Sequence, residues 1–291
     1  MNETDYRGPR KGQPTCSEVT CGGLTFRGAS VSAYKTFIFC RELGVIFDIG
    51  DVSEEMLALE TVFVSHGHQD HLLGITRYAG LRRLQHMHPP TIIVPEELAD
   101  HVRELFRVWN DLESMGKRQP PDFTLIAARP GEEIQIPGRR VAKPFAVPHA
   151  GPALGYTIFE RKQKLYPKFM GLGGREIAAL KARGEAVSYP YDRPLVRYVG
   201  DTTKAGLEAL AGLPDCPVTI VECTFLSDEH ESLAAPRGHL HIQHILDSFE
   251  LFGQGDLVLT HFSRRYGRTE VYQLLQRSLS ETQRDRIHLL L

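Results

Sequence analysis

The chain has 291 residues, which is enough for one large domain or two small ones. Its hydrophobic content of 42% suffices for a sizeable core, and 34 Lys plus Arg against 36 Asp plus Glu give a formal net charge of −2. This near balance excludes a general electrostatic attraction to nucleic acids or membranes, so binding of a polyanion would need a local basic patch.

The N-terminal residues 1–20 are polar and rich in Gly and Pro, which predicts a loose tail ahead of a domain spanning residues 21–291. Glu3 and Asp5, together with the lack of an apolar run, argue against a signal or transit peptide. No part of the chain approaches the roughly 20 apolar residues that span a bilayer, so we expect no membrane segment.

The five cysteines are odd in number and scattered, which is typical of reduced thiols in a cytoplasmic protein. Cys16 and Cys21 hint at a small metal clip. No second close pair completes such a clip, so packed or loosely held thiols are the favoured interpretation.

Short apolar runs separated by turn signals predict β-strands along the whole chain. They occupy residues 45–50, 61–65, 91–94, 123–127, 140–147, 153–159, 195–200, 218–222, 256–260 and 287–291. Amphipathic stretches at 96–113, 239–252 and 269–279 predict helices. Strands interspersed with helices favour an α/β fold with two sheets and helices outside them.

One segment differs from its surroundings in charge. Residues 161–183 contain seven Lys or Arg and one acid, Glu176, so the segment carries +6 in a chain of net charge −2. Gly171, Gly173 and Gly174 lie in its middle and predict local flexibility. A solvated basic surface and a contact for a polyanion are both consistent with this composition.

The stretch SHGHQDH at 65–71 directly follows a predicted strand and concentrates groups that bind metals. His66 and His68 are two residues apart on a turning backbone, so both rings can converge from one side, and Asp70 and His71 follow. One zinc ion takes about four N, O or S ligands, so further ligands must come from distant parts of the chain.

Three candidates each follow another predicted strand: His149, Asp201 and His261. Any one of them alone would most often be an ordinary polar residue, but all three together with the histidine-rich stretch favour a metal centre. Seven ligands support two ions roughly 3.5–4 Å apart that share the two oxygens of Asp201, an arrangement that suits phosphoryl chemistry. By contrast, His86, His88, His101 and His288 have no such placement and are predicted to be surface or capping residues.

The motifs together resemble the metallo-β-lactamase superfamily, and more narrowly the short, plant-like form of ribonuclease Z, the tRNA 3′-processing endonuclease. The resemblance spans about residues 24–270 and rests on FDIG (47–50), SHGHQDH (65–71), PPTIIVP (89–95), His149, GDTT (200–203), VECTFL (221–226), GHLHI (238–242) and LTHFSRRY (259–266). It implies an αββα sandwich of two mixed β-sheets flanked by helices, with a protruding flexible arm at 161–184.

The resemblance also implies roles for single residues. One zinc ion would be held by His66, His68, His149 and Asp201, and a second by Asp70, His71, Asp201 and His261, with Mn²⁺ or Mg²⁺ as substitutes. Asp70 would also act as general base for hydroxide attack on the phosphodiester. Glu222 and His239 resemble a proton-donor pair that protonates the leaving 3′-oxygen.

By the same resemblance the arm would grip precursor tRNA, and it would serve the active site of a partner in a homodimer. Its candidate RNA-binding residues are Lys162, Lys164, Lys168, Arg175, Lys181 and Arg183. Basic side chains on an arm suit RNA because its backbone can be recognised by shape and charge without reading sequence.

Two departures from the family pattern affect substrate contacts. Leu240 and His241 stand where many members have Ser-Thr, and DVSEE at 51–55 replaces the common GEGTQ. His241 and His244 are expected to support the site or lie on the surface. The alternative activity is hydrolysis of small phosphodiesters such as cyclic nucleotides; a non-catalytic RNA-binding relic and lactamase or thioesterase chemistry are less favoured.

Overall fold

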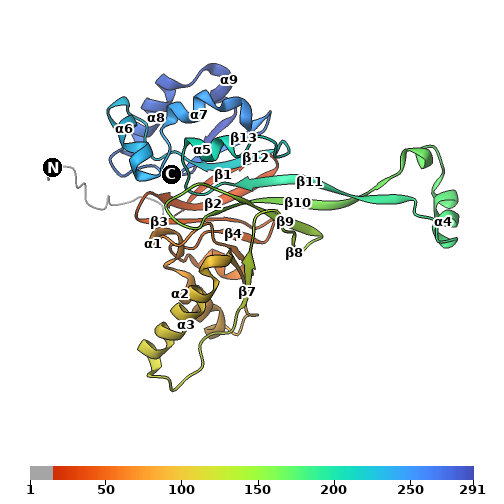
Figure 1. Cartoon of the computed structure of the whole chain (residues 1–291), viewed down its shortest axis with the longest axis horizontal. Helices are drawn as coiled ribbons and strands as arrows, with labels where there is room; N and C mark the ends of the chain where they lie inside the picture. The colour runs from red at the N-terminus through yellow and green to blue at the C-terminus, as the bar shows by residue number, and fades with distance from the viewer. Residues whose placement is uncertain (1–15) are drawn as a thin grey trace.

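The computed structural model describes residues 16–291, which form two seven-stranded sheets packed face to face with helices on the outer faces (Figure 1). Each sheet is mixed: its first four strands in chain order pair antiparallel and its last four pair parallel. The αββα sandwich predicted from the sequence is therefore confirmed.

The first sheet has its strands in chain order and is covered by two longer helices. Its strands are β1 (Ser17–Cys21), β2 (Leu24–Val31), β3 (Lys35–Cys40), β4 (Val45–Phe47), β5 (Thr61–Phe63), β6 (Thr91–Pro95) and β7 (Thr124–Ala128). The helices of this half are α1 (Gln69–Leu72), α2 (Ile75–Leu84) and α3 (Ala99–Ser114). An apolar cluster joins α2 and α3 to the outer face of the sheet.

The second sheet runs in the order β14 to β8. Its strands are β8 (Ile134–Ile136), β9 (Arg140–Ala146), β10 (Leu154–Leu165), β11 (Ser188–Tyr198), β12 (Val218–Glu222), β13 (Asp256–Thr260) and β14 (Ile287–Leu289). The helices of this half are α4 (Gly174–Ala182), α5 (Lys204–Glu208), α6 (Glu231–Ala234), α7 (Ile242–Asp247), α8 (Arg268–Ser278) and α9 (Glu281–Arg284).

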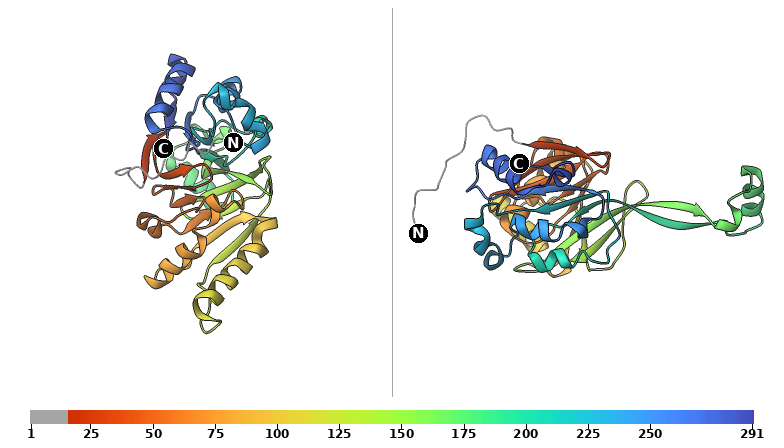
Figure 2. Two further views of the ribbon diagram at one scale, coloured as in Figure 1. Left: turned by 90° about the vertical axis from the view of Figure 1, so that its left-hand side faces the viewer. Right: turned by 90° about the horizontal axis from the view of Figure 1, so that it is seen from above.

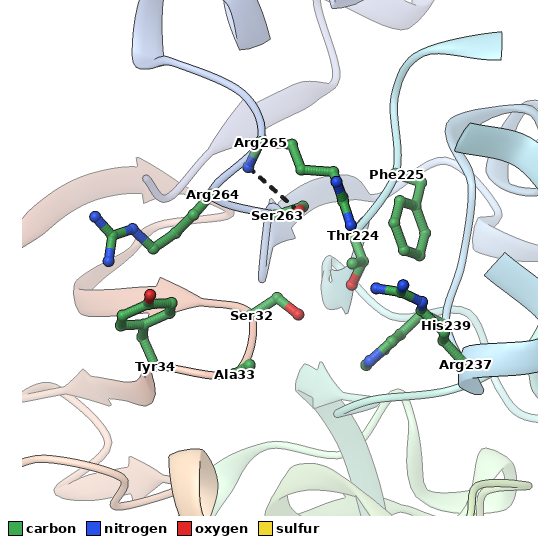
Figure 3. Close-up of a pocket in the computed structure, with 10 residues that line it drawn as sticks. All are labelled: Ser32, Ala33, Tyr34, Thr224, Phe225, Arg237, His239, Ser263, Arg264 and Arg265. Atoms are coloured by element: carbon green, nitrogen blue, oxygen red, sulfur yellow. Dashed lines mark hydrogen bonds between the residues drawn. The ribbon is translucent and has the colours of Figure 1, made fainter. Parts of the chain in front are cut away.

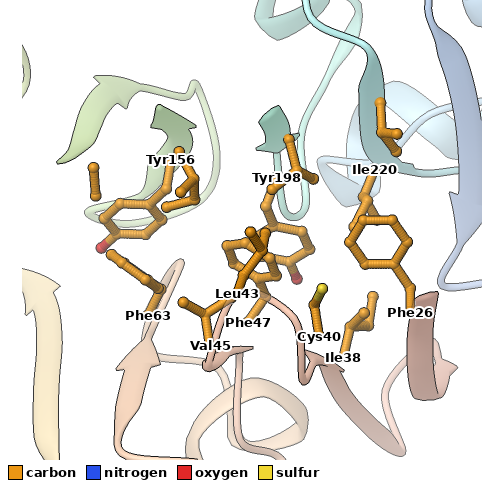
Figure 4. Packing of buried hydrophobic residues seen from close by; sticks show 14 of the residues in the cluster. Phe26, Ile38, Cys40, Leu43, Val45, Phe47, Phe63, Tyr156, Tyr198 and Ile220 are labelled. Carbon is orange, nitrogen blue, oxygen red and sulfur yellow. The ribbon is translucent and has the colours of Figure 1, made fainter. Parts of the chain in front are cut away.

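Aromatic side chains fill the space between the two sheets (Figure 4). Phe47 of β4 stacks on Tyr198 of β11 with ring centroids 4.9 Å apart, and Phe63 of β5 meets Tyr156 of β10 at the same separation. Removal of these large apolar surfaces from water is the main force that holds one sheet against the other.

The predicted basic arm protrudes from the sandwich, but it is more regular and longer than the range 161–184 (Figure 2). Strands β10 and β11 continue past the sheet as a two-stranded ribbon, paired from Glu160–Arg193 to Leu165–Ser188. Helix α4 lies at the tip. Flexibility of the Gly-rich stretch within it stays a prediction.

Some elements differ from the expectation. The predicted tail ended at residue 20, whereas Ser17–Cys21 forms the edge strand β1; the remainder, residues 1–15, lies outside the described residues. Strand β2 was not predicted because Arg27, Gly28 and Ser30 interrupt its apolar pattern, and β3 was missed although residues 37–40 form an apolar run. The helix expected at 239–252 is shortened to α7 and a 3₁₀ turn. Among residues 16–291, no helix combines the length and the apolar character that crossing a bilayer would need.

Gly50, which follows β4, allows close backbone contact with the histidine-rich loop at residues 65–71 because it has no side chain. A Cβ atom at this position would lie 1.8 Å from the carbonyl oxygen of Asp70 and 2.9 Å from the amide of Thr36, both backbone atoms. We expect Gly50→Ala to lower the free energy of unfolding by about 2 kcal/mol or more, because neither neighbour can rotate away.

The matched control is Gly80→Ala in α2, where no atom lies within 4 Å of the added Cβ. That substitution should be neutral or stabilise the protein by roughly 0.5–1 kcal/mol, since alanine is the better helix former. Urea unfolding of both variants measures the difference; equal stabilities would show that the contact at Gly50 does not constrain the loop.

Candidate metal centre and active site

The proposed site residues follow the carboxyl ends of strands from both sheets and meet at one edge of the sandwich. His66 follows β5, His149 follows β9, Asp201 follows β11 and His261 follows β13. Isolated bridges join the loops across this edge, between His66 and Ala153 and between Val31 and Phe262. The structure thus brings residues 195 positions apart into one cluster.

The first group consists of His66, His68, His149 and Asp201, whose ligand atoms all lie within 4.8 Å of one another. His149 Nε2 is 3.3 Å from His68 Nδ1, and His66 Nε2 is 3.8 Å from Asp201 Oδ2. Three nitrogens and one oxygen at this spacing are a set that a divalent metal ion can coordinate.

The second group contains Asp70, His71 and His261, again within 4.8 Å. Asp201 Oδ2 lies 3.3 Å from His71 Nε2 and 3.4 Å from His261 Nε2, so the same carboxylate faces both groups. Burial acts to raise the pKa of Asp70, but its hydrogen bond with His261 and the nearby imidazoles lower it to about 2. The cluster therefore presents ionised carboxylates.

Hydrogen bonds on the outer side of the imidazoles determine which nitrogen faces the cluster. Asp48 can only accept, so His71 Nδ1 donates to Asp48 Oδ2 at 2.6 Å and leaves the Nε2 lone pair directed inward. His149 Nδ1 likewise donates to the carbonyl of Gly238 at 3.1 Å. Such contacts fix the tautomer and orientation of a metal-binding histidine.

Two hydroxyl groups complete the same pattern. Ser65 Oγ donates its one hydrogen to Asp48 Oδ2, so it accepts from His66 Nδ1 at 2.9 Å. Thr224 Oγ1 donates to Glu222 Oε2, so it accepts from His261 Nδ1 at 3.1 Å. In the neutral form of these four imidazoles, the nitrogen that faces the cluster is therefore the one with the lone pair.

The cluster fits a bound cation better than a network of hydrogen bonds. His66 Nε2 is buried and has no hydrogen-bond partner among residues 16–291. An orphaned buried acceptor is costly, whereas a metal ion would satisfy it. The residues of both groups thus fit a divalent metal.

Glu222 and His239 form a separate pair beside the metal ligands. Glu222 ends β12 and is buried, and its Oε1 accepts from His239 Nδ1 at 2.8 Å and from the amide of Thr202. Burial disfavours the charged imidazole, but the charge of Glu222 and this hydrogen bond raise the pKa of His239 to about 9. His239 is therefore an imidazolium at neutral pH.

His239 also lines a cavity of about 400 Å³ that opens next to the cluster (Figure 3). Arg237, Arg264 and Arg265 line this cavity, and Arg264 lies over the ring of Tyr34 at 4.2 Å. Guanidinium groups and an aromatic ring suit a phosphodiester chain with its bases, because they supply bidentate donors and a stacking surface.

The sequence reasoning missed some residues that support the site. Asp48 was noted within FDIG without a role, although a carboxylate at a strand end was the available signal. Thr224 and Arg237 carried no signal of their own. His239 does not begin a helix as expected, since it lies in the loop before α7. His241 caps that helix by accepting from the amide of Gln243, so it has a structural role.

Comparison with known proteins agrees with the fold. A family model described as a beta-lactamase superfamily domain matches residues 50–262, which is well over half of the chain. The crystal structure of human tRNase Z, short form, superposes with a TM-score of 0.57 at 17% identity and covers 90% of this chain and 93% of its own; this supports the fold. The protein is thus a hydrolase of the metallo-β-lactamase superfamily.

Closer relatives define the family within that class. The tRNase Z TRZ1 of Arabidopsis thaliana is 34% identical over 255 residues, which cover 86% of this chain and 89% of the relative. The chloroplastic tRNase Z TRZ2 of the same plant is 29% identical and covers 87% of this chain and 71% of the relative. The chain belongs to the ribonuclease Z family.

Replacement of Asp48 tests whether its hydrogen bonds to Ser65 and His71 hold the cluster in a metal-binding geometry. Asp48→Asn keeps the shape but cannot accept from Ser65, His71 and Tyr198 as an anion does. We expect metal affinity to fall roughly 10–100-fold. Competition with a chromophoric chelator measures the affinity, and Asp51→Asn, a partly exposed acid of the same loop, is the control. Unchanged affinity in Asp48→Asn would contradict the assigned role.

Proposed function

We propose that this chain is a metal-dependent endoribonuclease that removes the 3′ trailer from precursor tRNA and leaves a 3′-hydroxyl. The names of its relatives suggest the substrate class. The observation that carries the proposal is the position of the Glu222–His239 pair between the metal-binding cluster and the arginine-lined cavity. A proton donor there suits a reaction in which an alkoxide leaves, whereas a thioester releases a thiolate that needs no proton.

Two zinc ions per chain are the cofactors we propose, with Mn²⁺ or Mg²⁺ as substitutes. His66, His68, His149 and Asp201 would hold one ion, and Asp70, His71, Asp201 and His261 the other. When bound, such ions lower the pKa of water and offset negative charge on phosphate oxygens.

Two side chains handle the protons of the reaction. Asp70 Oδ2, oriented by the amide of Ala33 at 2.8 Å, takes a proton from the attacking water. The P–O3′ bond then breaks, and the leaving 3′-oxygen takes the proton of His239 Nε2–H. Glu222 accepts from Nδ1 of that imidazole and stabilises its charged form, which is restored when Nε2 takes a proton from water. The products are a 3′-hydroxyl on the tRNA and a 5′-phosphate on the trailer.

The arm favours a long substrate over a small one. Asp201 follows the carboxyl end of β11, whereas the arm tip precedes its amino end. Eleven residues at about 3.3 Å each separate the two by roughly 35 Å. A cyclic nucleotide cannot touch both places, but a folded tRNA can.

Basic residues of the arm that already pair with acidic side chains are weaker candidates for contacts with RNA phosphates. Lys162 lies 3.1 Å from Glu160, and Lys168 lies 4.0 Å from Glu185, so part of the positive charge is offset. Arg175, Lys181 and Arg183 lie exposed in or beside α4, and the described part of the chain contains no ion pair for them. We propose that these three, with Lys164, make the main phosphate contacts.

Deletion of the arm tip tests the substrate. Leu165 and Ser188 are cross-strand partners, so Asn-Gly in place of residues 166–187 would close the ribbon with a two-residue turn. We expect the variant to lose precursor-tRNA cleavage at least ~100-fold and to keep hydrolysis of bis(p-nitrophenyl) phosphate, because the metal cluster is distant. Single-turnover cleavage and the chromogenic assay measure the two activities.

A milder variant removes charge without removing the arm tip. It combines Arg175→Gln, Lys181→Gln and Arg183→Gln. It should weaken tRNA binding and reduce the salt dependence of binding by about three phosphate contacts. A full-length protein that cleaves cyclic nucleotides but no precursor tRNA would instead support the small-substrate activity. A protein without either activity when loaded with metal would support the non-catalytic alternative.

The proton donor is tested by the choice of leaving group. His239→Ala should slow RNA cleavage about 10²–10⁴-fold, because the 3′-alkoxide needs a proton, and should slow release of nitrophenolate less than tenfold. His244→Ala, a neighbouring histidine that faces His241, is the control. Equal slowing of both substrates by His239→Ala would remove the assignment.

A homodimer, in which the arm of one chain serves the active site of the other, is the proposed assembly. Leu84 at the end of α2 (74% exposed), Leu112 in α3 (70%) and Met115 directly after α3 (82%) lie in solvent, and we propose that these apolar side chains contact a second copy. We expect sedimentation of the wild type as a dimer and of Leu112→Glu as a monomer. Tyr272→Glu in α8 is the exposed control, and a monomeric wild type at assay concentration would contradict the assembly.

The cytoplasm is the proposed compartment. All five cysteines are free of disulfides, and four of them are buried. Such thiols persist where the surroundings keep them reduced.

A further inference from the structure

A second group of metal-ligating side chains lies outside the cluster described above. Cys21 ends β1, Asp256 begins β13 and His288 is the middle residue of β14. One ligand atom from each, a sulfur, an oxygen and a nitrogen, lies within 4.8 Å of the others. None of the three takes part in the proposed reaction.

The backbone brings these residues together from opposite ends of the chain. Strand β1 is the edge of the first sheet and β14 is the edge of the second. Gly22 donates its amide to Asp256 Oδ2 at 3.0 Å, and Ser17 donates its hydroxyl to the carbonyl of Leu291. The two edges are therefore held beside each other by contacts on both sides of the group.

The imidazole of His288 is the second observation that points to a ligand. Its Nε2 is buried and makes no hydrogen bond to any residue between 16 and 291, although Asp256 Oδ1 is 3.4 Å away. That separation is close to the ~3.3–3.5 Å expected between two ligand atoms that are each about 2.0–2.1 Å from a tetrahedral zinc ion. The histidine predicted to be an ordinary surface residue is thus partly buried and aimed into the group.

We propose that Cys21, Asp256 and His288 bind a zinc ion, with water as the fourth ligand, and that this ion fastens the first and last strands of the sandwich. The mixed S, O and N set suits zinc and is too soft for Mg²⁺ or Ca²⁺. The side chains of Asp256 and His288 are about 30% exposed, at 29% and 30%, which leaves a path for the ion and room for the water.

The location argues for a structural role. Exposed edge strands are prone to fraying and to pairing with other chains, and a bound ion would hold both edges in register. Cys21 was noted in the sequence for its closeness to Cys16, but its partners come instead from the other end of the chain. The proposal does not rest on the activity of the other centre.

A thiolate ligand produces a spectroscopic signal that the histidine-rich centre does not produce, because the ligand groups there contain no cysteine. Full-length protein is stripped with a chelator and titrated with Co²⁺. We expect a near-ultraviolet sulfur-to-cobalt charge-transfer band in the wild type. The band should be lost in Cys21→Ser and kept in Cys40→Ser, where the thiol is buried in the same sheet beside Glu42 without an imidazole.

Metal content after reloading with zinc gives the second readout. Cys21→Ser and His288→Gln should each bind one zinc ion fewer per chain than the wild type, with circular dichroism as the check on folding. His288→Gln alters a partly exposed side chain and serves if Cys21→Ser fails to fold. A wild type without the band, or a band unchanged in Cys21→Ser, would overturn the proposal and leave His288 and Asp256 as a simple ion pair.

Discussion

The carboxylate of Asp48 is the interaction on which the active edge depends. It is fully buried at the end of β4 and accepts hydrogen bonds from Ser65 and His71 of the first half and from the hydroxyl of Tyr198 in the second. One anion therefore links the two sheets and orients a metal-binding imidazole. A buried charge is tolerated only when it is fully hydrogen-bonded, which explains why the surrounding donors are so closely set.

Thr224 repeats this arrangement on the other side of the cluster. Its hydroxyl donates to Glu222 and accepts from His261, so the proposed proton-donor pair and a candidate metal ligand share one hydrogen-bond partner. His261 has a left-handed backbone, with φ of 62°, and its buried ring lies with Nε2 3.4 Å from Asp201 Oδ2. Strain of this kind persists where the surrounding contacts determine the conformation.

The ribbon separates the basic tip from the candidate active site. The active edge lies at one end of β11 and the basic tip at the other, so the two can be altered independently. Ion pairs of Arg161 with Asp192 and Glu133 stiffen the base of the ribbon, where it leaves the sheet. Positive charge is thereby concentrated at the tip rather than spread along the arm, in a chain whose total charge is close to zero.

The sequence by itself determined most strands with continuous apolar runs, the layered α/β class and the seven candidate metal ligands, because polar groups that follow buried strands are a local pattern. It did not reveal β2, whose pairing with β3 depends on Gly28, where a Cβ would lie 2.0 Å from the carbonyl of Phe37. Tertiary structure alone decided the role of Asp48, the arginine-lined cavity and the group around His288. Each of these joins residues far apart in the chain, and their spacing depends on how the two sheets pack, which no local pattern encodes.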